Sequence, residues 1–334
     1  MAAIGLLTTA LFVTHLAVQL PAGRGADRFG SQSVALLAIA AGVVGNAILI
    51  LDAGFEVALV ARAIVGIGSG AAFVAGLDLV RAGGGGTALQ GLYGGATMTG
   101  GGLALMIVPA LTDATSWRAA YWTAGLLAVL AAIPTLLATG LPRIGHAGDW
   151  LLRDRALLPL GVMQAATFGL AVVAGNWVVP LLERQGASST AAGLAGGLVL
   201  FVGIVTRPAG GVLAGRVPRR LLVAAALVGT SAGAFLLALG ASLAVSTIGA
   251  FVLGLMAGLP FAVIFAAAQR LRPDAPAAAI ALVNGCAVLT ILVGTPLAGL
   301  AFELPSDGRV AFAAIAVLAA AALIPLRTTR IEGR

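Results

Sequence analysis

Two arginines stand out because they lie inside long apolar stretches of the chain. Arg62 falls in the run 55–80, and Arg207 falls in the run 187–214. A charge at the centre of a bilayer costs about 2.5–3.5 kcal/mol on insertion scales, so a retained arginine indicates a task such as binding a charged ligand. Two guanidinium groups in apolar surroundings favour an anionic ligand. The alternative is that each side chain extends to the membrane surface and binds nothing.

Four further polar side chains at apolar positions are candidates for contact with a substrate. His15 and Gln19 are four residues apart, which places them on one face of a helix. Asn176 and Asn284 lie in later apolar runs. A histidine can carry a proton near neutral pH, whereas the amides can only donate and accept hydrogen bonds. The alternative for all four is a hydrogen bond between helices, which contributes about 0.6 kcal/mol on average.

A short basic turn that is rich in glycine occurs twice. The first copy runs from Gly23 to Gly30 and reads GRGADRFG, and the second runs from Gly211 to Arg220 and reads GVLAGRVPRR. Each copy has a glycine, an alanine three residues later and an arginine two residues after that alanine. One motif in two places is typical of membrane proteins built from related halves.

The composition determines the class of protein that must hold these residues. Hydrophobic residues make up 60% of the 334 residues and charged residues 9%, whereas soluble domains have about 25% charged residues. This predicts an integral membrane protein. All nineteen basic residues are arginines in a chain of net charge +7, but they are spread over short loops, so we expect no nucleic-acid partner. The sequence has no nucleotide-binding motif, metal-ligand cluster or nucleophile–base pair, which predicts no enzyme activity, no metal and no cofactor.

Eleven apolar runs are each long enough to cross a bilayer, which needs roughly 20 residues per helix. They lie at about 2–22, 33–51, 55–80, 86–111, 118–140, 156–181, 187–214, 220–241, 243–269, 275–301 and 308–327. If the loops alternate in side, fourteen of the nineteen arginines fall on one side and three on the other. Because basic loops stay in the cytoplasm, this predicts a plasma-membrane protein with a cytoplasmic C-terminus.

The chain divides into an expected N-terminal bundle at 1–140, a polar cytoplasmic loop at 141–155 and a C-terminal bundle at 156–330. Aligning the two basic turns gives five runs to the first half and six to the second. We therefore expect that a first helix is missing, through truncation, a wrong start or natural variation. The residues 331–334 resemble an engineered protease site, and we expect no functional role for them.

The first turn, read from Gln19 to Gly30, resembles the cytoplasmic loop motif between helices two and three of the major facilitator superfamily. The stretch from Arg207 to Arg216 resembles its weaker repeat between helices eight and nine. Arg62 followed by spaced glycines up to Gly70 resembles the helix-four motif, and Ser116 to Trp122 resembles the entry into helix six. The chain departs from the pattern at Gly215, where aspartate is typical.

The resemblance implies two pseudo-symmetric bundles that contain helices 2–12 of twelve, and a gating role for the turns. On this interpretation, Asp27 and Arg28 form charge pairs that hold one conformation, and Asp78 is close enough to pair with Arg28. The implied gating residues are Gly23, Asp27, Arg28, Gly30, Asp78, Gly211, Arg216 and Arg219. The alternative is that these are solvated loop charges that only set orientation.

We therefore expect a secondary transporter that moves a small solute by alternating access, with an anion favoured by Arg62 and Arg207. The expected partners are the solute, the lipid bilayer and a coupling proton or exchanged ion, and we expect a monomer. Two alternatives stay open. One is a non-transporting or truncated relative of the superfamily, and the other is an exporter of drugs or metabolites.

Overall fold

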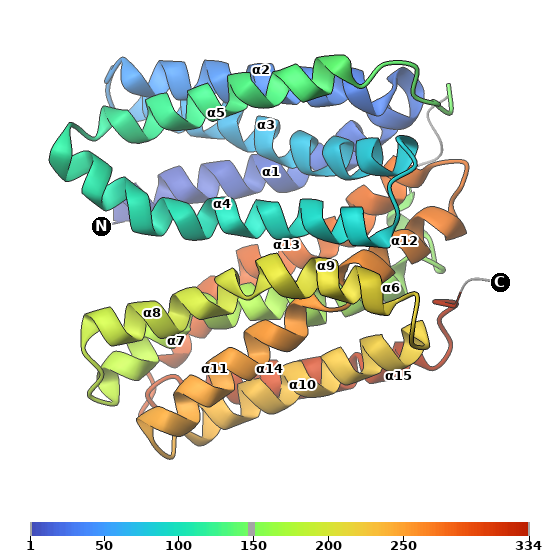
Figure 1. Cartoon of the computed structure of the whole chain (residues 1–334). Coiled ribbons are helices and arrows are strands. Elements are labelled where there is room, and N and C mark those ends of the chain that lie inside the picture. Colours follow the sequence, from blue (N-terminus) through green and yellow to red (C-terminus); the bar gives the residue numbers. More distant parts are fainter. Residues whose placement is uncertain (1, 146–150, 333–334) are drawn as a thin grey trace. The chain divides into compact units, whose positions relative to one another are not determined.

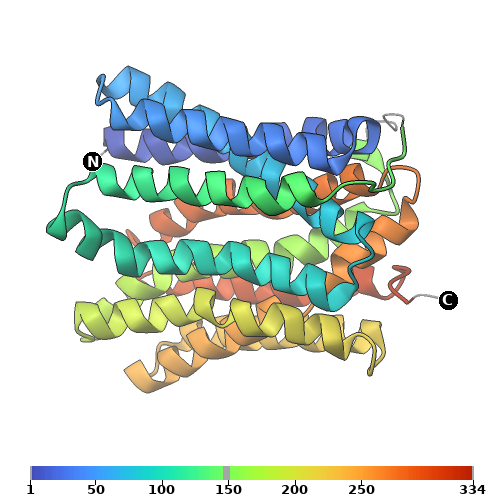
Figure 2. The same ribbon diagram turned by 45° about the horizontal axis from the view of Figure 1, so that its top comes forward.

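The computed structural model describes residues 2–145 and 151–332, and each regular element within them is helical. Figures 1 and 2 show these helices from two directions. In chain order they are α1 (Ala2–Phe29), α2 (Ser31–Ile50), α3 (Phe55–Ala82), α4 (Thr87–Ala114), α5 (Arg118–Leu137), α6 (Leu158–Gln164), α7 (Leu170–Arg184), α8 (Ser189–Phe201), α9 (Gly203–Leu213), α10 (Arg219–Leu239), α11 (Leu243–Gly258), α12 (Phe261–Leu271), α13 (Pro276–Ala301), α14 (Arg309–Ala321) and α15 (Leu323–Leu326). A 3₁₀ turn lies at Leu151–Arg153 and a π-helical turn at Ala165–Gly169. The prediction of an all-helical chain is confirmed.

Nine helical segments among the described residues are long and apolar enough to cross a membrane. They are Leu6–Phe29, Ser31–Ile50, Phe55–Ala82, Arg118–Leu137, Leu158–Arg184, Arg219–Leu239, Leu243–Leu271, Pro276–Ala301 and Arg309–Leu326. The other two predicted runs, 86–111 and 187–214, are occupied by α4 and by α8 with α9. Each of the eleven apolar runs is therefore helical.

Some of these segments are interrupted at identifiable residues. Pro260 lies between α11 and α12, where its lack of an N–H removes one hydrogen bond of the helix. The π-helical turn that contains Phe168 joins α6 to α7. Turns of this kind widen a helix locally and are frequent at functional sites.

The chain folds into two compact units. The first comprises Met1–Gly85, Leu103–Arg153 and Arg272–Gly285, and the second comprises Gly86–Gly102, Asp154–Leu271 and Cys286–Arg334. The first turns of α13 thus belong to the first unit, and the first turns of α4 belong to the second. The division into bundles at 1–140 and 156–330 stays a prediction. Residues 146–150 of the predicted loop lie outside the described residues.

Glycines allow the helices of the first unit to pack closely. A Cβ atom on Gly68 of α3 would lie 2.8 Å from the carbonyl oxygen of Ala38 and 2.8 Å from the amide nitrogen of Gly42, both on α2. Another face of α3 contacts α1, where a Cβ atom on Gly70 would lie 2.6 Å from a methyl group of Val18. Small residues let helix backbones approach in a membrane, where van der Waals packing drives helix association. The spaced glycines that follow Arg62 are therefore packing residues.

The end of the described chain also belongs to the fold. Ile331 is fully buried, and the carboxylate of Glu332 accepts a hydrogen bond from the backbone N–H of Arg220 at 2.9 Å. Although the segment 331–334 resembles an engineered protease site in sequence, Ile331 and Glu332 take part in packing within the second unit. Residues 333–334 lie outside the described part.

We expect Gly68→Ala to lower Tm, because the new methyl group meets backbone atoms that cannot rotate away. Overpacking of this kind typically costs about 1–3 kcal/mol. Gly125→Ala is the matched control, since Gly125 lies inside α5 and a Cβ atom added there would have no other atom within 4 Å. Thermal unfolding of the detergent-purified variants measures both. An equal Tm for Gly68→Ala and Gly125→Ala would contradict the packing role of Gly68.

Candidate functional site

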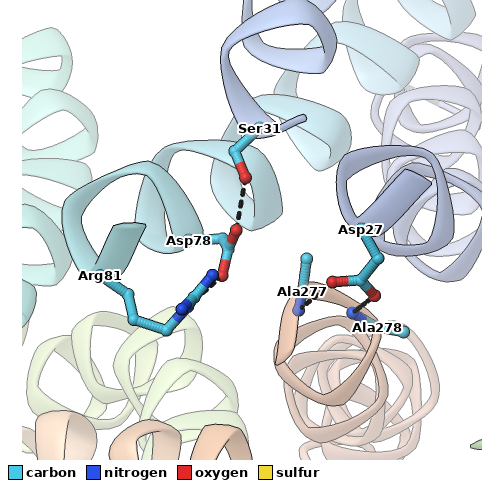
Figure 3. Close-up of polar contacts among 6 residues, drawn as sticks. All are labelled: Asp27, Ser31, Asp78, Arg81, Ala277 and Ala278. Carbon is cyan, nitrogen blue, oxygen red and sulfur yellow. Dashed lines mark hydrogen bonds and ion pairs between the residues drawn. The ribbon is translucent and has the colours of Figure 1, made fainter. Parts of the chain in front are cut away.

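The carboxylate of Asp27 binds the first turn of α13. Its Oδ1 accepts a hydrogen bond from the backbone N–H of Ala277 and its Oδ2 one from Ala278, each at 3.0 Å. Figure 3 shows the carboxylate directed at these two nitrogens. Asp27 is 2% exposed, so water does not compete for the interaction. Both partners lie in the first compact unit.

The local sequence explains why α13 needs this side chain. The helix begins at Pro276, which has no N–H, so Ala277 and Ala278 carry its first free donors. The residue before Pro276 is Ala275, whose side chain has no acceptor, so no capping group is supplied at that position. A carboxylate is also favourable at the positive N-terminal end of the helix dipole. Asp27 therefore caps a helix that begins about 250 residues later in the chain.

Gly23 makes the approach of α1 to α13 possible. A Cβ atom there would lie 2.7 Å from the carbonyl oxygen of Ala277 and 2.8 Å from the Cα of Ala278. At Gly25, two residues on, the nearest atom would be a methyl group of Val34 at 3.5 Å, which is an ordinary contact. Gly30 has φ of +94°, a conformation that side chains rarely adopt, and it separates α1 from α2. Gly23 and Gly30 thus have different roles, close contact at the first and backbone conformation at the second.

A second buried carboxylate, that of Asp78, has its own set of polar partners (Figure 3). Its Oδ1 lies 2.6 Å from Nε of Arg81, and its Oδ2 accepts a hydrogen bond from the hydroxyl of Ser31. The predicted pairing with Arg28 is not formed in this structure, because Arg81, one turn further along α3, holds this carboxylate. The guanidinium of Arg28 instead lies 4.9 Å from the ring centroid of Phe29. Arg81 and Ser31 were not singled out in the sequence, although Arg81 stands three residues after Asp78.

Deeper along α1, two predicted residues contact each other. Asn284 donates a hydrogen bond from Nδ2 to Oε1 of Gln19 at 3.1 Å, and both side chains are buried. This leaves Nε2 of Gln19 and Oδ1 of Asn284 without a hydrogen-bond partner among the described residues. A buried group without a partner costs about 1–3 kcal/mol, so these two atoms are candidates for a further hydrogen bond.

His15 and Asn176 are each bonded to a hydroxyl group on a neighbouring helix. Nδ1 of His15 lies 2.9 Å from Oγ of Ser69 on α3. Asn176 on α7 donates to Oγ1 of Thr295 on α13 at 3.3 Å. These are interhelical hydrogen bonds, which were the alternative to a solute contact for both residues.

The second basic turn lies in the second unit and contacts the start of α4. The hydroxyl of Thr87 donates to the carbonyl oxygen of Gly211 at 2.7 Å. A Cβ atom on Gly211 would meet the backbone of Thr87 and lie 2.8 Å from the Cα of Ala88. Gly211 thus touches the first turn of a helix, as Gly23 does. Gly215, which occupies the position that corresponds to Asp27, has no carboxylate to cap that helix.

The other predicted residues of this turn lie near its surface. Arg216 is exposed, and Arg219 is partly exposed and begins α10. The backbone N–H of Arg219 donates to the carboxylate of Glu332 at 3.4 Å. The carboxylate at the second basic turn is therefore that of Glu332, near the end of the described chain. The motif alone did not indicate this residue.

Arg207 is the most enclosed cation of the second unit and is 2% exposed. Nη1 donates to the carbonyl oxygen of Gly94 on α4 at 2.6 Å. Its guanidinium lies 4.2 Å from the ring centroid of Phe261 and 4.7 Å from that of Phe168. Cation–π attraction offsets part of its desolvation. No acidic side chain of the described residues forms an ion pair with Arg207.

A small hollow adjoins this arginine. It is lined by Met98, Phe168, Ala171, Val172, Val199, Gly203, Arg207, Ala257 and Gly258. Arg207 is the one charged side chain in this lining. Sequence reasoning missed the two aromatic rings, because Phe168 and Phe261 read as ordinary apolar residues of their runs.

Arg62, the other predicted cation, is partly buried on α3 in the first unit. Within the described residues it takes part in no ion pair and no side-chain hydrogen bond. The structure thus brings together Gln19 with Asn284 and joins Asp27 to α13, and it leaves Arg62 apart from these pairs.

The comparisons agree with this architecture. The sequence profile of the Major Facilitator Superfamily matches the chain over residues 1–174 and again over residues 157–332. The chain therefore belongs to this superfamily of membrane transporters, and the resemblance noted in the sequence is confirmed.

Two solved structures are similar to this chain. The structure of the human organic anion transporter MFSD10 (TETRAN) has a TM-score of 0.77 and 17% identity, and the alignment covers 96% of this chain and 83% of that one. The E. coli fucose:proton symporter FucP has a TM-score of 0.80 and 14% identity, with 100% and 92% covered. At these identities the likeness shows the fold. No curated protein sequence matches significantly.

We expect Asp27→Asn to accelerate amide hydrogen exchange at Ala277 and Ala278, because the neutral amide is a weaker acceptor and loses one of two carboxylate oxygens. Losing a helix cap costs about 0.5–2 kcal/mol, which corresponds to about 2- to 30-fold faster exchange. Mass spectrometry of the peptide that contains the start of α13 measures it.

Asp78→Asn is the matched control, because that carboxylate is also buried but bonds to Arg81 and Ser31. Equal acceleration in both variants would show that a general loosening, rather than loss of the cap, is responsible.

Proposed function

We propose that this member of the superfamily is a secondary active transporter that moves a small anionic solute across the plasma membrane by alternating access. Family membership supports transport. The charge of the solute is inferred from Arg207 alone. We further propose that the arginine-rich loops and the C-terminus lie in the cytoplasm, because of the strong bias of arginine to one side of the chain.

The observation that carries the proposal is the buried guanidinium of Arg207, which forms no ion pair with an acidic side chain among the described residues. A charge in low-dielectric surroundings is expensive unless it is paired. A guanidinium has five N–H donors, and one hydrogen bond to Gly94 with two ring contacts leaves most of them available. An anion bound beside Arg207 would supply the missing charge.

The hollow beside Arg207 has a volume of about 10 Å³, which is room for about one water molecule, so a solute would bind here only in a conformation in which the hollow is wider. Its remaining lining is apolar, so a carboxylate or an inorganic anion would obtain its charge interaction from Arg207. Of the two similar structures, the human protein is named an organic anion transporter and the bacterial protein a fucose:proton symporter. Both classes of solute therefore belong in a first panel.

The cap of Asp27 on α13 fits a contact that forms in one conformation and breaks in another. Its expected strength of about 0.5–2 kcal/mol would shift a two-state equilibrium by about 2- to 30-fold. This is strong enough to bias the populations and weak enough to be reversed during each transport cycle. Gly23 belongs to the same gate because it brings α1 close to α13.

Gln19 with Asn284 is our proposed polar contact for the solute, and His15 is the proposed proton carrier. The two unpaired amide atoms of the first pair provide one donor and one acceptor. His15 is a titratable side chain of α1 that lies inside the span Leu6–Phe29 and has a polar partner, Ser69.

We expect proteoliposomes to take up at least one anion from a panel of nitrate, nitrite, cyanate, carboxylates, sugars and cationic drugs, tested with and without a pH gradient. Arg207→Gln should weaken the apparent affinity for that anion by about 10-fold or more, since a charged hydrogen bond contributes about 1.5–3 kcal/mol. Initial uptake rates over a range of concentrations measure this.

Arg184→Gln removes the same charge from a side chain that is 44% exposed and serves as the control. Unchanged anion affinity in a monodisperse Arg207→Gln protein would rule out the substrate role of Arg207. Uptake of uncharged or cationic solutes alone would favour an exporter of drugs or metabolites, and no uptake at all would favour the non-transporting alternative.

A further inference from the structure

A second hollow in the second unit is lined by two arginines and does not include Arg207. Its volume is about 260 Å³, and it is lined by Arg155, Ala156, Pro159, Leu271, Thr328, Thr329 and Arg330. It contains none of the residues assigned to solute binding or gating. Its arginines come from two parts of the chain, one before α6 and one after α15.

The hollow lies where three membrane spans end. The span Leu158–Arg184 begins beside Arg155, the span Leu243–Leu271 ends at one of the lining residues, and the span Arg309–Leu326 ends just before Thr328. The ends of such spans are expected at the boundary between hydrocarbon and water, so a hollow between three of them would face lipid headgroups. It is on the side of the chain that carries most of the arginines.

The segment that carries Arg330 is fixed on both sides. Arg220 donates from Nη2 to the carbonyl oxygen of Thr329 at 3.0 Å, and Arg270 donates from Nη2 to that of Ile331 at 3.1 Å. Ile331 is fully buried, and Glu332 accepts two backbone N–H groups at the start of α10. The wall that holds Arg330 is therefore held in place by hydrogen bonds within the protein.

The charge balance of the hollow is positive. Neither Arg155 nor Arg330 forms an ion pair within the described residues, and both side chains are exposed. The neighbouring Asp154 accepts the backbone N–H groups of Ala156 and Leu157, and Glu332 is bound to α10. The hydroxyls of Thr328 and Thr329 donate to the carbonyl oxygen of Pro325, so the two guanidinium groups are the groups left to bind a ligand.

We propose that this hollow binds a phosphate group between Arg155 and Arg330, with an anionic phospholipid headgroup as the natural source. Guanidinium groups match phosphate oxygens in charge and geometry. Pro159 and Leu271 give the hollow an apolar wall where the glycerol end of a lipid can lie. Basic pockets between membrane helices are suited to such headgroups, whereas free phosphate would use the same two cations without the apolar wall.

The test compares purified wild-type protein with Arg155→Gln/Arg330→Gln in zwitterionic detergent micelles. Increasing fractions of phosphatidylglycerol or of phosphatidylcholine are added, and the rise in Tm gives an apparent affinity. Each arginine near an anionic surface contributes about fivefold, so the double variant should bind phosphatidylglycerol about thirtyfold more weakly. Phosphatidylcholine should give little shift with either protein.

Arg153→Gln is the matched control, because it removes a positive charge two residues before Arg155 that does not line the hollow. It should keep the wild-type response. Arg155→Lys/Arg330→Lys retains both charges and should keep most of the response, which provides a folded comparison if the glutamine variant is unstable. A double glutamine variant that responds to phosphatidylglycerol like the wild type would overturn the proposal.

A parallel titration with inorganic phosphate, against chloride at equal ionic strength, separates the two sources. Stabilisation by phosphatidylglycerol but not by phosphate would assign the site to lipid. Stabilisation by phosphate that is lost in the double glutamine variant would assign it to a free phosphate-bearing ion. Equal loss of the lipid response in Arg153→Gln would overturn the site by showing that only net charge matters.

Discussion

The first free N–H groups of α13 impose a constraint on which the organisation of the first unit depends. Pro276 and Ala275 offer no acceptor to them, so the acceptor must come from a distant part of the chain. Asp27 provides it at the end of α1, and Gly23 lets the two helices approach to the required distance. The carboxylate of Asp27 and the absence of a side chain at Gly23 thus join two segments that are far apart in the sequence. The same need to satisfy backbone groups explains why Glu332 lies at the start of α10.

The two copies of the basic turn illustrate how a repeated motif can diverge in chemistry while keeping its geometry. In both, the leading glycine touches the first turn of a helix, α13 for Gly23 and α4 for Gly211. Only the first copy has a carboxylate that accepts from that helix. In the second, a neutral hydroxyl on Thr87 bonds to the turn itself. The charged contact is sensitive to electrostatic surroundings and the neutral one is not, which makes the first copy the better candidate for a gate.

Arginine is accommodated in two ways in this protein. Arg207 is surrounded by aromatic rings and one carbonyl group, which lowers the cost of burial without neutralising the charge. Arg155 and Arg330 are exposed side chains just outside the ends of predicted membrane spans. The first arrangement suits a ligand that must be stripped of water, and the second suits a component of the bilayer itself. Both depend on neighbouring acids being absent or already bonded.

The sequence by itself determined the helical membrane architecture and the positions of the apolar spans. These follow from the length of the apolar runs and from the distribution of arginine between them, which are local properties that can be read along one chain. It also named Asp27, Gln19, Asn284 and Arg207 as candidate site residues. Only the tertiary structure decided their partners: the cap on α13, the amide pair, the ring cage, and Arg81 rather than Arg28 beside Asp78. The physical reason is that a hydrogen bond or ion pair depends on distances of a few ångströms between distant helices, and these are set by the packing of the whole unit.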